Sequence, residues 1–575
     1  MTAPRLDLVL LWHMHQPDYR DRASGDFAMP WTYLHALKDY TDMAAHLERH
    51  PGIRAVVNFV PVLLDQIEDY VRQFQTGAFR DPLLRLLQRP SLDDLSDAER
   101  TLLLAACFRC HHPTMLAPFP RYARLHELHE SLAREGPAAL AYLSGAYCAD
   151  LVTWYHLVWT GESERRREPL LAELMAKGEG YDVADRRSLL AYIGRTLAAL
   201  VSRYRALQAR GQIELSATPY SHPLAPLLLD FAAARESQPD APLPLAAHYP
   251  GGRERLEQHF AAARQSHAER FGVAPTGMWP AEGALSAGVV RMAAAAGCRW
   301  LASGENVLKN SLGAPPPDAA YRPWQLSGAP GLSLFFRDDR LSDLIGFEYA
   351  KWHGRDAAAH FVVQLEEIAA STTDAAVPVV SVILDGENAW EFYPYNGFYF
   401  FEDLYGLLEN HPAIRTRTCA DIVAQQDAGA APPAPSLPGL TAGSWVYGTL
   451  STWIGDPAKN HAWDLLCAAK QSYDRVMASG RLTAAERAAA EAQLAICESS
   501  DWFWWFGDYN PAAAVTGFDR LFRHNLANLY RCLQLAPPAQ LAVPIATGNP
   551  GAAVAAGGTM RRAGEGPPHP PHPAT

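Results

Sequence analysis

The feature that most constrains the fold of this chain is an apolar run at residues 377–384 (VPVVSVIL), which stops abruptly at Asp385. A β-branched run of this length indicates a strand buried on both faces, as in a parallel sheet. Parallel α/β sheets place their functional groups just beyond the carboxyl ends of the strands. Acids and aromatics follow at that position, in the segment DGENAWEFYPYNG at residues 385–397. The sequence therefore predicts an active-site edge that begins at Asp385.

Similar short apolar runs recur along the chain and alternate with helical patterns. Helical spacing is clear at residues 253–271 and 285–296, on either side of one of these runs. Strands that alternate with helices indicate a parallel α/β sheet or barrel. We therefore predict an α/β fold with seven strands, at residues 6–12, 54–59, 212–217, 276–280, 299–303, 332–337 and 377–384.

The remainder of the chain divides by composition into helical, linking and terminal segments. Leu, Ala and Arg at helical spacing predict a helical insertion at about 70–207, inside a barrel domain at 1–428. A Pro- and Ala-rich stretch then predicts a linker at 429–442, followed by a C-terminal helical domain at 443–546. The last segment, 547–575, is rich in Gly, Ala and Pro. Because that composition buries too little apolar surface to order itself, we predict a disordered tail.

Composition limits the classes of partner. The 62 acidic and 50 basic residues give a formal charge of −12, which disfavours nonspecific attraction to nucleic acid or to an anionic membrane. No run approaches the ~20 apolar residues of a membrane span. The eight cysteines form no regular framework, as expected for reduced thiols. We therefore predict a cytoplasmic protein whose partner is neutral or cationic.

One cysteine spacing resembles a cofactor motif. Cys107, Cys110 and His111 match the C-x-x-C-H pattern of covalent haem attachment, and His112 adds a fourth candidate zinc ligand. Haem attachment of this kind requires export, and the N-terminus offers only a short apolar run at residues 8–12. Thiols packed on a helix are the favoured interpretation, and we predict no cofactor.

Histidines gather after the first and third predicted strands. His13 and His15 stand at i and i+2, so they project to the same side if the strand continues through them. They could bind a metal or a polyhydroxylated ligand, or they could be core histidines with backbone partners. The second cluster places Glu214 on its strand and His222 in the turn that follows.

Carboxylates beside aromatics follow two further strands. Glu282 lies in a turn bounded by Pro and Gly, next to Trp279, where a glutamate could also serve only as a favourable charge before a helix. Asp385 is followed by Glu387 and Trp390, although an isolated turn aspartate commonly binds backbone. Two carboxylates on separate strand ends, surrounded by aromatic rings, meet the requirements of glycosidic bond cleavage. One protonates the leaving oxygen, the other attacks the anomeric carbon or activates water, and the rings stack on sugars.

Taken together, five segments resemble glycoside hydrolase family 57, whose members act mainly on α-glucans with retention of configuration. The resemblance extends over nearly all of the chain to about residue 535. Its segments, in order, are HMHQP at 13–17, GQIELSATPYSHP at 211–223, MWPAE at 278–282, LDGENAW at 384–390 and SSDWFWWFG at 499–507.

The resemblance implies a seven-stranded (β/α)7 barrel with a helical domain that helps to close the cleft. It implies Glu282 as the nucleophile and Asp385 as the general acid/base, which for retention should lie roughly 5 to 5.5 Å apart. The chain departs from the family at Trp279-Pro280, where a hydrophobic residue often intervenes, and this affects the turn more than the identity of Glu282. The candidate substrate-binding residues are His13, His15, Gln16, Trp31, Glu214, His222, Trp279, Glu387, Trp390, Asp501, Trp502 and Trp505.

The resemblance leaves several reactions open. We favour endo-type hydrolysis of α-1,4-glucans such as starch, glycogen or maltodextrins, of amylase or amylopullulanase type, with α-1,6 linkages as a further candidate. A 4-α-glucanotransferase or a branching enzyme is the close alternative, since both use the same glycosyl intermediate. A zinc-dependent carbohydrate deacetylase or mannosidase would instead use His13, His15 and a nearby carboxylate. A noncatalytic glucan-binding protein would use the aromatics only as stacking platforms.

Overall fold

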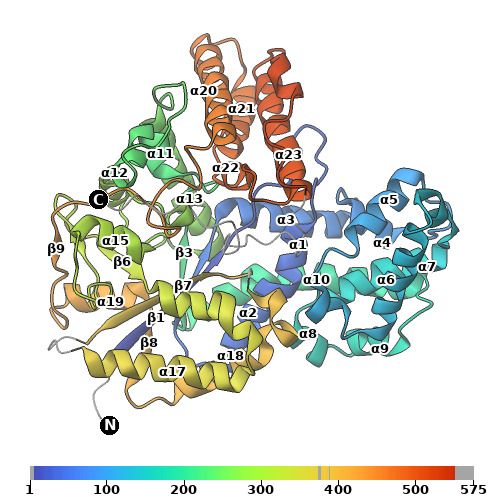
Figure 1. Ribbon diagram of the computed structural model, residues 1–575, viewed down its shortest axis with the longest axis horizontal. Helices are drawn as coiled ribbons and strands as arrows, with labels where there is room; N and C mark the ends of the chain where they lie inside the picture. The colour runs from blue at the N-terminus through green and yellow to red at the C-terminus, as the bar shows by residue number, and fades with distance from the viewer. Residues whose placement is uncertain (1–4, 373–376, 388, 551–575) are drawn as a thin grey trace.

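The computed structural model describes residues 5–372, 377–387 and 389–550 (Figure 1). A parallel sheet lies at its centre, with helices around it. Six of the seven predicted strands are present, and a strand that was not predicted joins them. The strands of this sheet are β1 (Leu6–Met14), β2 (Ala55–Phe59), β3 (Ile213–Ala217), β4 (Trp300–Gly304), β6 (Ser333–Arg337), β7 (Val379–Asp385) and β8 (Ile414–Arg417).

The long strand β1 organises the sheet. It pairs with β7 on one side, and on the other side with β8 near its start and with β2 near its end. The path β3-β2-β1-β7-β6-β4 is closed by Met278, which forms parallel bridges to Ala217 and to Leu301. The sheet therefore curls into a β/α barrel, which confirms the predicted fold class.

The predicted strand at 276–280 is the exception. Only Met278 pairs with its neighbours, through those two isolated bridges. Pro275 and Pro280 flank the segment, and a proline cannot donate a ladder hydrogen bond. The ring is therefore completed by a short bridging segment in place of a full strand.

Side chains from alternate strand positions fill the barrel. Val9 and Leu11 of β1 pack with Val56, Trp300 and Ile383 in one apolar cluster. The same cluster includes Cys419, Ile422 and Val423 of the helix α19 (Cys419–Asp427), which follows β8. Because β8 pairs with the start of β1, α19 closes the end of the barrel at which the strands begin, so that the opposite end is the one available for a site.

Helices surround the barrel, and one group forms a separate lobe on the right of Figure 1, in blue to cyan. Most helices of this lobe belong to the stretch between β2 and β3, which contains α3 (Pro61–Thr76), α4 (Pro82–Gln88), α5 (Asp97–Ala106), α6 (Pro120–Ala133), α7 (Gly145–Val158), α8 (Glu162–Arg167), α9 (Pro169–Lys177) and α10 (Val183–Ala209). The others are α1 (Trp31–His35), α2 (Thr41–Arg49), α11 (Ala225–Leu229), α12 (Ala234–Ser237), α13 (Gly252–Phe271), α14 (Ala287–Ala295), α15 (Glu305–Leu312), α16 (Asp339–Asp343), α17 (Gly354–Ser371) and α18 (Phe398–Glu409).

The C-terminal helices stand above the barrel in Figure 1, in orange and red. They are α20 (Pro457–Ala478), α21 (Ala484–Cys497), α22 (Asp501–Trp505) and α23 (Ala512–Cys532). A capping box of Thr483 and Glu486 begins α21. Within the predicted linker, the short strand β9 (Ser436–Leu437) pairs with β5 (Gln325–Leu326), and Leu437 is fully buried. Of the predicted tail, residues 551–575 lie outside the described residues.

The C-x-x-C-H segment belongs to the helical lobe. Cys107 and Cys110 are buried, and burial raises the pKa of the Cys110 thiol to about 12. His111 contacts Thr114 and His112 contacts a backbone carbonyl of the same segment. These contacts fit the interpretation of thiols packed on a helix. Within the described ranges, no helix is both long enough and apolar enough to cross a membrane.

Candidate active site

A buried pocket lies where the carboxyl ends of β1 and β7 meet the C-terminal helices. Segments that are far apart in the sequence supply its walls, and most of them belong to the motifs identified above. The residues that line it are His13, His15, Gln16, Pro17, Tyr19, His222, Glu282, Asp385, Glu387, Asp501, Trp505 and Phe518.

Glu282 is held in an unusual backbone conformation. The residue has φ 60° and ψ 21°, the left-handed region that non-glycine residues seldom adopt. Its side chain is almost fully buried. Oε1 lies 3.2 Å from Ser500 Oγ, and Oε2 accepts from Trp445 Nε1 at 3.2 Å. The strained turn thus directs a carboxyl group at the pocket, where both of its oxygens have hydrogen-bond partners.

The electrostatics of the pocket favour the protonated form of Glu282. Burial, and then the charges of Asp501 and Asp385, raise the pKa of Glu282 to about 8, against the smaller opposing effect of the Trp445 and Ser500 hydrogen bonds. The sequence-based mechanism requires an ionised Glu282. Loss of a neighbouring negative charge, such as that of Asp385, would lower the pKa of Glu282 and favour its ionised form.

Asp385 is the last residue of β7 and pairs in register with His13 of β1. Gly386 then donates its backbone N–H to the His13 carbonyl at 2.7 Å. A Cβ at Gly386 would lie only 2.0 Å from the sulfur of Met14, so a larger residue here would displace the Met14 side chain. The position of Asp385 at the pocket wall is therefore fixed by the strand before it and by the glycine after it.

Glu387 follows on the same wall. Gln16 Nε2 donates to Glu387 Oε1 at 3.2 Å, and the hydroxyl of Tyr19 donates to Gln16 at 2.8 Å. Burial and the charge of Asp385 raise the pKa of Glu387 well above its usual value. The neighbouring motif residue Asn388 lies outside the described residues.

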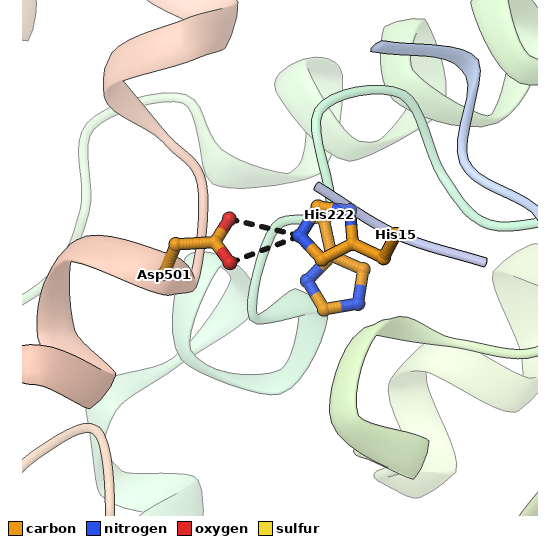
Figure 2. A group of neighbouring side chains, drawn as sticks. All are labelled: His15, His222 and Asp501. Carbon is orange, nitrogen blue, oxygen red and sulfur yellow. Dashed lines mark hydrogen bonds and ion pairs between the residues drawn. The ribbon is translucent and has the colours of Figure 1, made fainter. Parts of the chain in front are cut away.

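His15 and His222 lie against each other at the N-terminal end of α22 (Figure 2). Their rings stack with centroids 3.8 Å apart and planes inclined by 16°. His15 Nε2 contacts both carboxylate oxygens of Asp501, at 2.9 and 3.0 Å. Positive φ angles at Ser221 and His222, of 66° and 63°, turn the loop after β3 toward these groups. Asp501 of the helical region is thereby joined to the barrel.

The same three residues are the group among the described residues whose ligand atoms could surround a metal ion, since these atoms lie within 4.8 Å of one another. Histidine binds a metal in the plane of its ring, along the nitrogen lone pair. Two rings stacked almost parallel at 3.8 Å direct their lone pairs side by side, and these do not converge on one ion. The arrangement does not fit a zinc site.

Several predicted substrate-binding residues do not line the pocket. Glu214 lies on the barrel floor, where it accepts from Trp300 Nε1 at 2.7 Å and from the Ala420 backbone N–H of α19 at 2.8 Å. Trp31 packs on Trp159 in the helical core. We therefore leave Glu214 and Trp31 out of the proposed substrate-binding set.

Three predicted tryptophans support the pocket from behind. The indole N–H of Trp390 donates to the Gly386 carbonyl at 2.9 Å, and that of Trp502 donates to the Ile496 carbonyl at 2.9 Å. Trp279 is fully buried and meets Trp445 edge to face, with ring centroids 5.2 Å apart. These three rings hold the turns that carry pocket residues, and only Trp505 of the predicted tryptophans lines the pocket itself.

Ser500 and Trp445 are residues that sequence reasoning missed as parts of the site. Ser500 lay inside a recognised motif, but nothing in the sequence distinguished it from Ser499. Trp445 lay in a Gly- and aromatic-rich segment with no periodic pattern. The structure brings it to Glu282 because Gly443 pairs with Leu285, two residues beyond the Pro280–Gly283 turn.

Comparisons with known proteins agree with this geometry. The model of glycosyl hydrolase family 57 matches residues 9–432. Comparison with curated protein sequences gives no match. A branching enzyme of this family from Thermococcus kodakaraensis is 14% identical and superposes with a TM-score of 0.57, covering 92% of this chain and 90% of that one.

Two further solved structures have the same fold. An α-amylase from Thermotoga maritima is 12% identical, with a TM-score of 0.54 and 94% of each chain covered. A 4-α-glucanotransferase from Thermococcus litoralis is 13% identical, with a TM-score of 0.51, covering 92% of this chain and 60% of that one. Identities this low establish a common fold, whereas the family match extends over most of the sequence. The chain belongs to glycosyl hydrolase family 57.

Proposed function

We propose that this protein is a retaining glycoside hydrolase that cleaves α-1,4-glucans by double displacement, with α-1,6 linkages as further candidate substrates. The observation that carries the proposal is that Glu282, after the bridging segment at Met278, and Asp385, at the end of β7, line one buried pocket. Trp505, Phe518 and Tyr19 on the same pocket offer rings to sugar faces, and His13 and Gln16 offer polar groups to hydroxyls.

The carboxyl pair must share a single proton for this chemistry. In the first step Asp385 gives its proton to the glycosidic oxygen, the bond from that oxygen to the anomeric carbon breaks, and Glu282 bonds to that carbon. In the second step Asp385 takes a proton from water, which displaces Glu282. Because the charge of Asp385 contributes to the high pKa of Glu282, transfer of the shared proton to Asp385 is what ionises the nucleophile. Ser500 and Trp445 then stabilise the carboxylate.

A glucanotransferase or branching reaction is the second candidate. Trp505 and Phe518 of the C-terminal helices line the pocket, and apolar rings at this wall favour a sugar hydroxyl over water as the acceptor. The similar structures named above include both activities, although at identities that show only the fold. Water and sugar acceptors give different products from the same intermediate, so product analysis separates them.

The test is a product profile on amylose, pullulan and maltoheptaose, by chain length, linkage and anomeric configuration. Hydrolysis gives shorter chains with retained configuration, transfer gives both longer and shorter chains, and branching gives new α-1,6 linkages. Glu282→Gln and Asp385→Asn should each lower turnover at least about a thousandfold. Glu214→Gln is the matched control, because Glu214 is another buried barrel glutamate and lies away from the pocket.

Near-normal turnover in either pocket variant would refute its assigned role. Exhaustive chelation of the purified protein should leave turnover unchanged, which would separate this proposal from a zinc-dependent deacetylase or mannosidase. An unchanged profile of chain length and linkage on all three glucans would favour a noncatalytic glucan-binding protein.

The proposal includes an α-glucan partner and a cytoplasmic location. All eight cysteines are free, and seven of them are buried. Free thiols in this number suit a reducing compartment.

A further inference from the structure

A continuous row of side chains connects Asn58, deep in the barrel, to Glu282. His13 Nδ1 lies 2.7 Å from Asn58 Oδ1, and His13 Nε2 lies 3.1 Å from His222 Nε2. His222 Nδ1 lies 2.8 Å from Ser500 Oγ, which is 3.2 Å from Glu282 Oε1. All five side chains are buried, so each of these four contacts needs one hydrogen-bond donor and one acceptor.

The position of each proton follows from the end of the row. Asn58 Oδ1 also accepts from Thr218 Oγ1 at 3.0 Å, while Asn58 Nδ2 donates to Ser216 Oγ at 2.8 Å. The Asn58 atom that faces His13 is therefore an acceptor, and His13 carries its proton on Nδ1. Burial and the charge of His15 lower the pKa of His13 to about 3, so His13 has no second proton and its Nε2 is an acceptor.

The same reasoning extends to Glu282. His222 must donate through Nε2 to His13, and burial together with His15 and His13 lowers its pKa well below the usual value. Its Nδ1 is therefore an acceptor, and it takes the single hydroxyl proton of Ser500. Ser500 Oγ then offers only lone pairs to Glu282 Oε1, and their contact is a hydrogen bond only if Glu282 is protonated.

We propose that Asn58, His13, His222 and Ser500 form a proton-ordering relay that keeps a proton on Glu282 while the pocket holds no glucan. Asn58 and Ser500 are positioning residues of this relay, since Asn58 acts only through His13 and Ser500 only orients a proton. The titratable groups that face Glu282 from other elements are Asp385 of β7, Asp501 of α22 and His222 of the loop after β3. His15 and Glu387 complete the pocket.

The relay deepens the proposed function, on which its catalytic meaning rests. It stores the nucleophile in its unreactive, protonated form until glucan binds. The proton then passes from Glu282 to the Asp385 carboxylate, which leaves Glu282 ionised and Asp385 as the acid, with no net uptake or release. Rotation of the Ser500 hydroxyl from His222 Nδ1 toward Glu282 lets Ser500 donate to the new carboxylate, while both histidines keep their protons in place.

The test measures protonation of Glu282 without glucan. Infrared difference spectra between a protein and its Glu282→Gln counterpart isolate the carboxyl band of Glu282, and a pH series gives its midpoint. Asn58→Leu should lower the midpoint by about one unit. Without the Asn58 acceptor, His13 can carry its proton on Nε2, His222 can carry its proton on Nδ1, and Ser500 then donates to the Glu282 carboxylate. The free energy of one neutral hydrogen bond corresponds to a pKa shift of about one unit. In the Ser500→Ala background, Asn58→Leu should produce no shift, because the row is broken.

Thr218→Val is the matched control: it removes the other buried donor to Asn58 but leaves the row intact, and the midpoint should stay in place. An unchanged midpoint in folded Asn58→Leu, or a shift that persists without Ser500, would overturn the relay. If Asn58→Leu fails to fold, nitrogen-15 shifts of His222 in the unaltered protein decide. A proton on Nε2 supports the relay and a proton on Nδ1 overturns it. These spectra need no substrate, so an inactive protein with the expected midpoints would refute the proposed function alone.

Discussion

Glu498 joins the C-terminal helices to the barrel, and its neutralisation should destabilise the protein. Its carboxylate is fully buried at the end of α21 and accepts from Arg255 Nε at 2.8 Å, Arg255 NH2 at 2.7 Å and His259 Nε2 at 2.8 Å. Tyr249 donates to it as well. Arg255 and His259 belong to α13, so these bonds connect two parts of the fold directly before Ser500 and Asp501.

The change Glu498→Gln keeps the shape but leaves the guanidinium of Arg255 buried without its full counter-charge. Removal of one partner from a buried ion pair costs about 3 to 5 kcal/mol, and Arg255 keeps a longer contact to Glu491 at 3.7 Å. We therefore expect a loss of about 3 kcal/mol in the free energy of unfolding, measured by urea denaturation. A double variant, Arg255→Met with Glu498→Leu, should lose less, because no unpaired charge remains.

The pH dependence supplies a second check. Although burial raises it, Arg255 and His259 hold the pKa of Glu498 far below its usual range. A depressed pKa gives stability that is complete above the ordinary glutamate pKa and is lost as pH falls toward the folded value. The difference between the parent protein and Glu498→Gln should thus be constant from pH 7 to about 5 and shrink below about pH 4. A loss under ~1 kcal/mol at pH 7, or a double variant as unstable as the single one, would refute this reasoning.

Two further predictions concern buried groups outside the pocket. Burial raises the pKa of Glu214 to about 7, so the free energy of unfolding should fall by about 3 kcal/mol as the pH rises from about 4.5 to 7. Denaturation curves at each pH should show that Glu214→Gln removes this fall. The KM of the variant for a glucan should stay unchanged. Cys532 is the only described cysteine that is partly exposed, so a maleimide should label it first in the native protein; peptide mass spectrometry showing earlier labelling of Cys107 or Cys419 would contradict the burial of those thiols.

The strands that were predictable are those whose apolar runs are buried on both faces. β1 and β7 are of this kind, since their central residues contact the barrel interior on one side and helices on the other. β8 escaped prediction because Ile414–Arg417 alternates apolar or small residues with arginines, a weak pattern for so short a segment. The segment around Met278 was over-predicted because its prolines limit pairing that a β-rich composition alone suggests.

For the site, the order of the motifs predicted at which strand end each residue lies, but not how deep in the barrel its side chain lies. Glu214 and Ser216 lie on the same inward face of β3, yet Ser216 contacts Asn58 beneath the pocket and Glu214 contacts the floor helix α19. A period of two residues assigns a face, whereas depth depends on the register between strands. The contact of Trp445 with Glu282 depends on chain pairing at Gly443, which no local pattern encodes.

The contacts of Glu282 also show why the barrel alone is an incomplete site. Its two hydrogen-bond partners, Ser500 and Trp445, both come from beyond residue 442, and so does Asp501, the neighbouring charge that contributes most to its raised pKa. The barrel supplies the carboxyl groups that we propose to react, and the chain that follows it supplies the groups that stabilise or oppose their charge. Since the same segment lines the pocket with Trp505, both the pocket wall and the ionisation of the proposed nucleophile depend on one docking interaction. Glu498 lies at that interaction, so a defect there should reduce turnover through Glu282 before the protein unfolds.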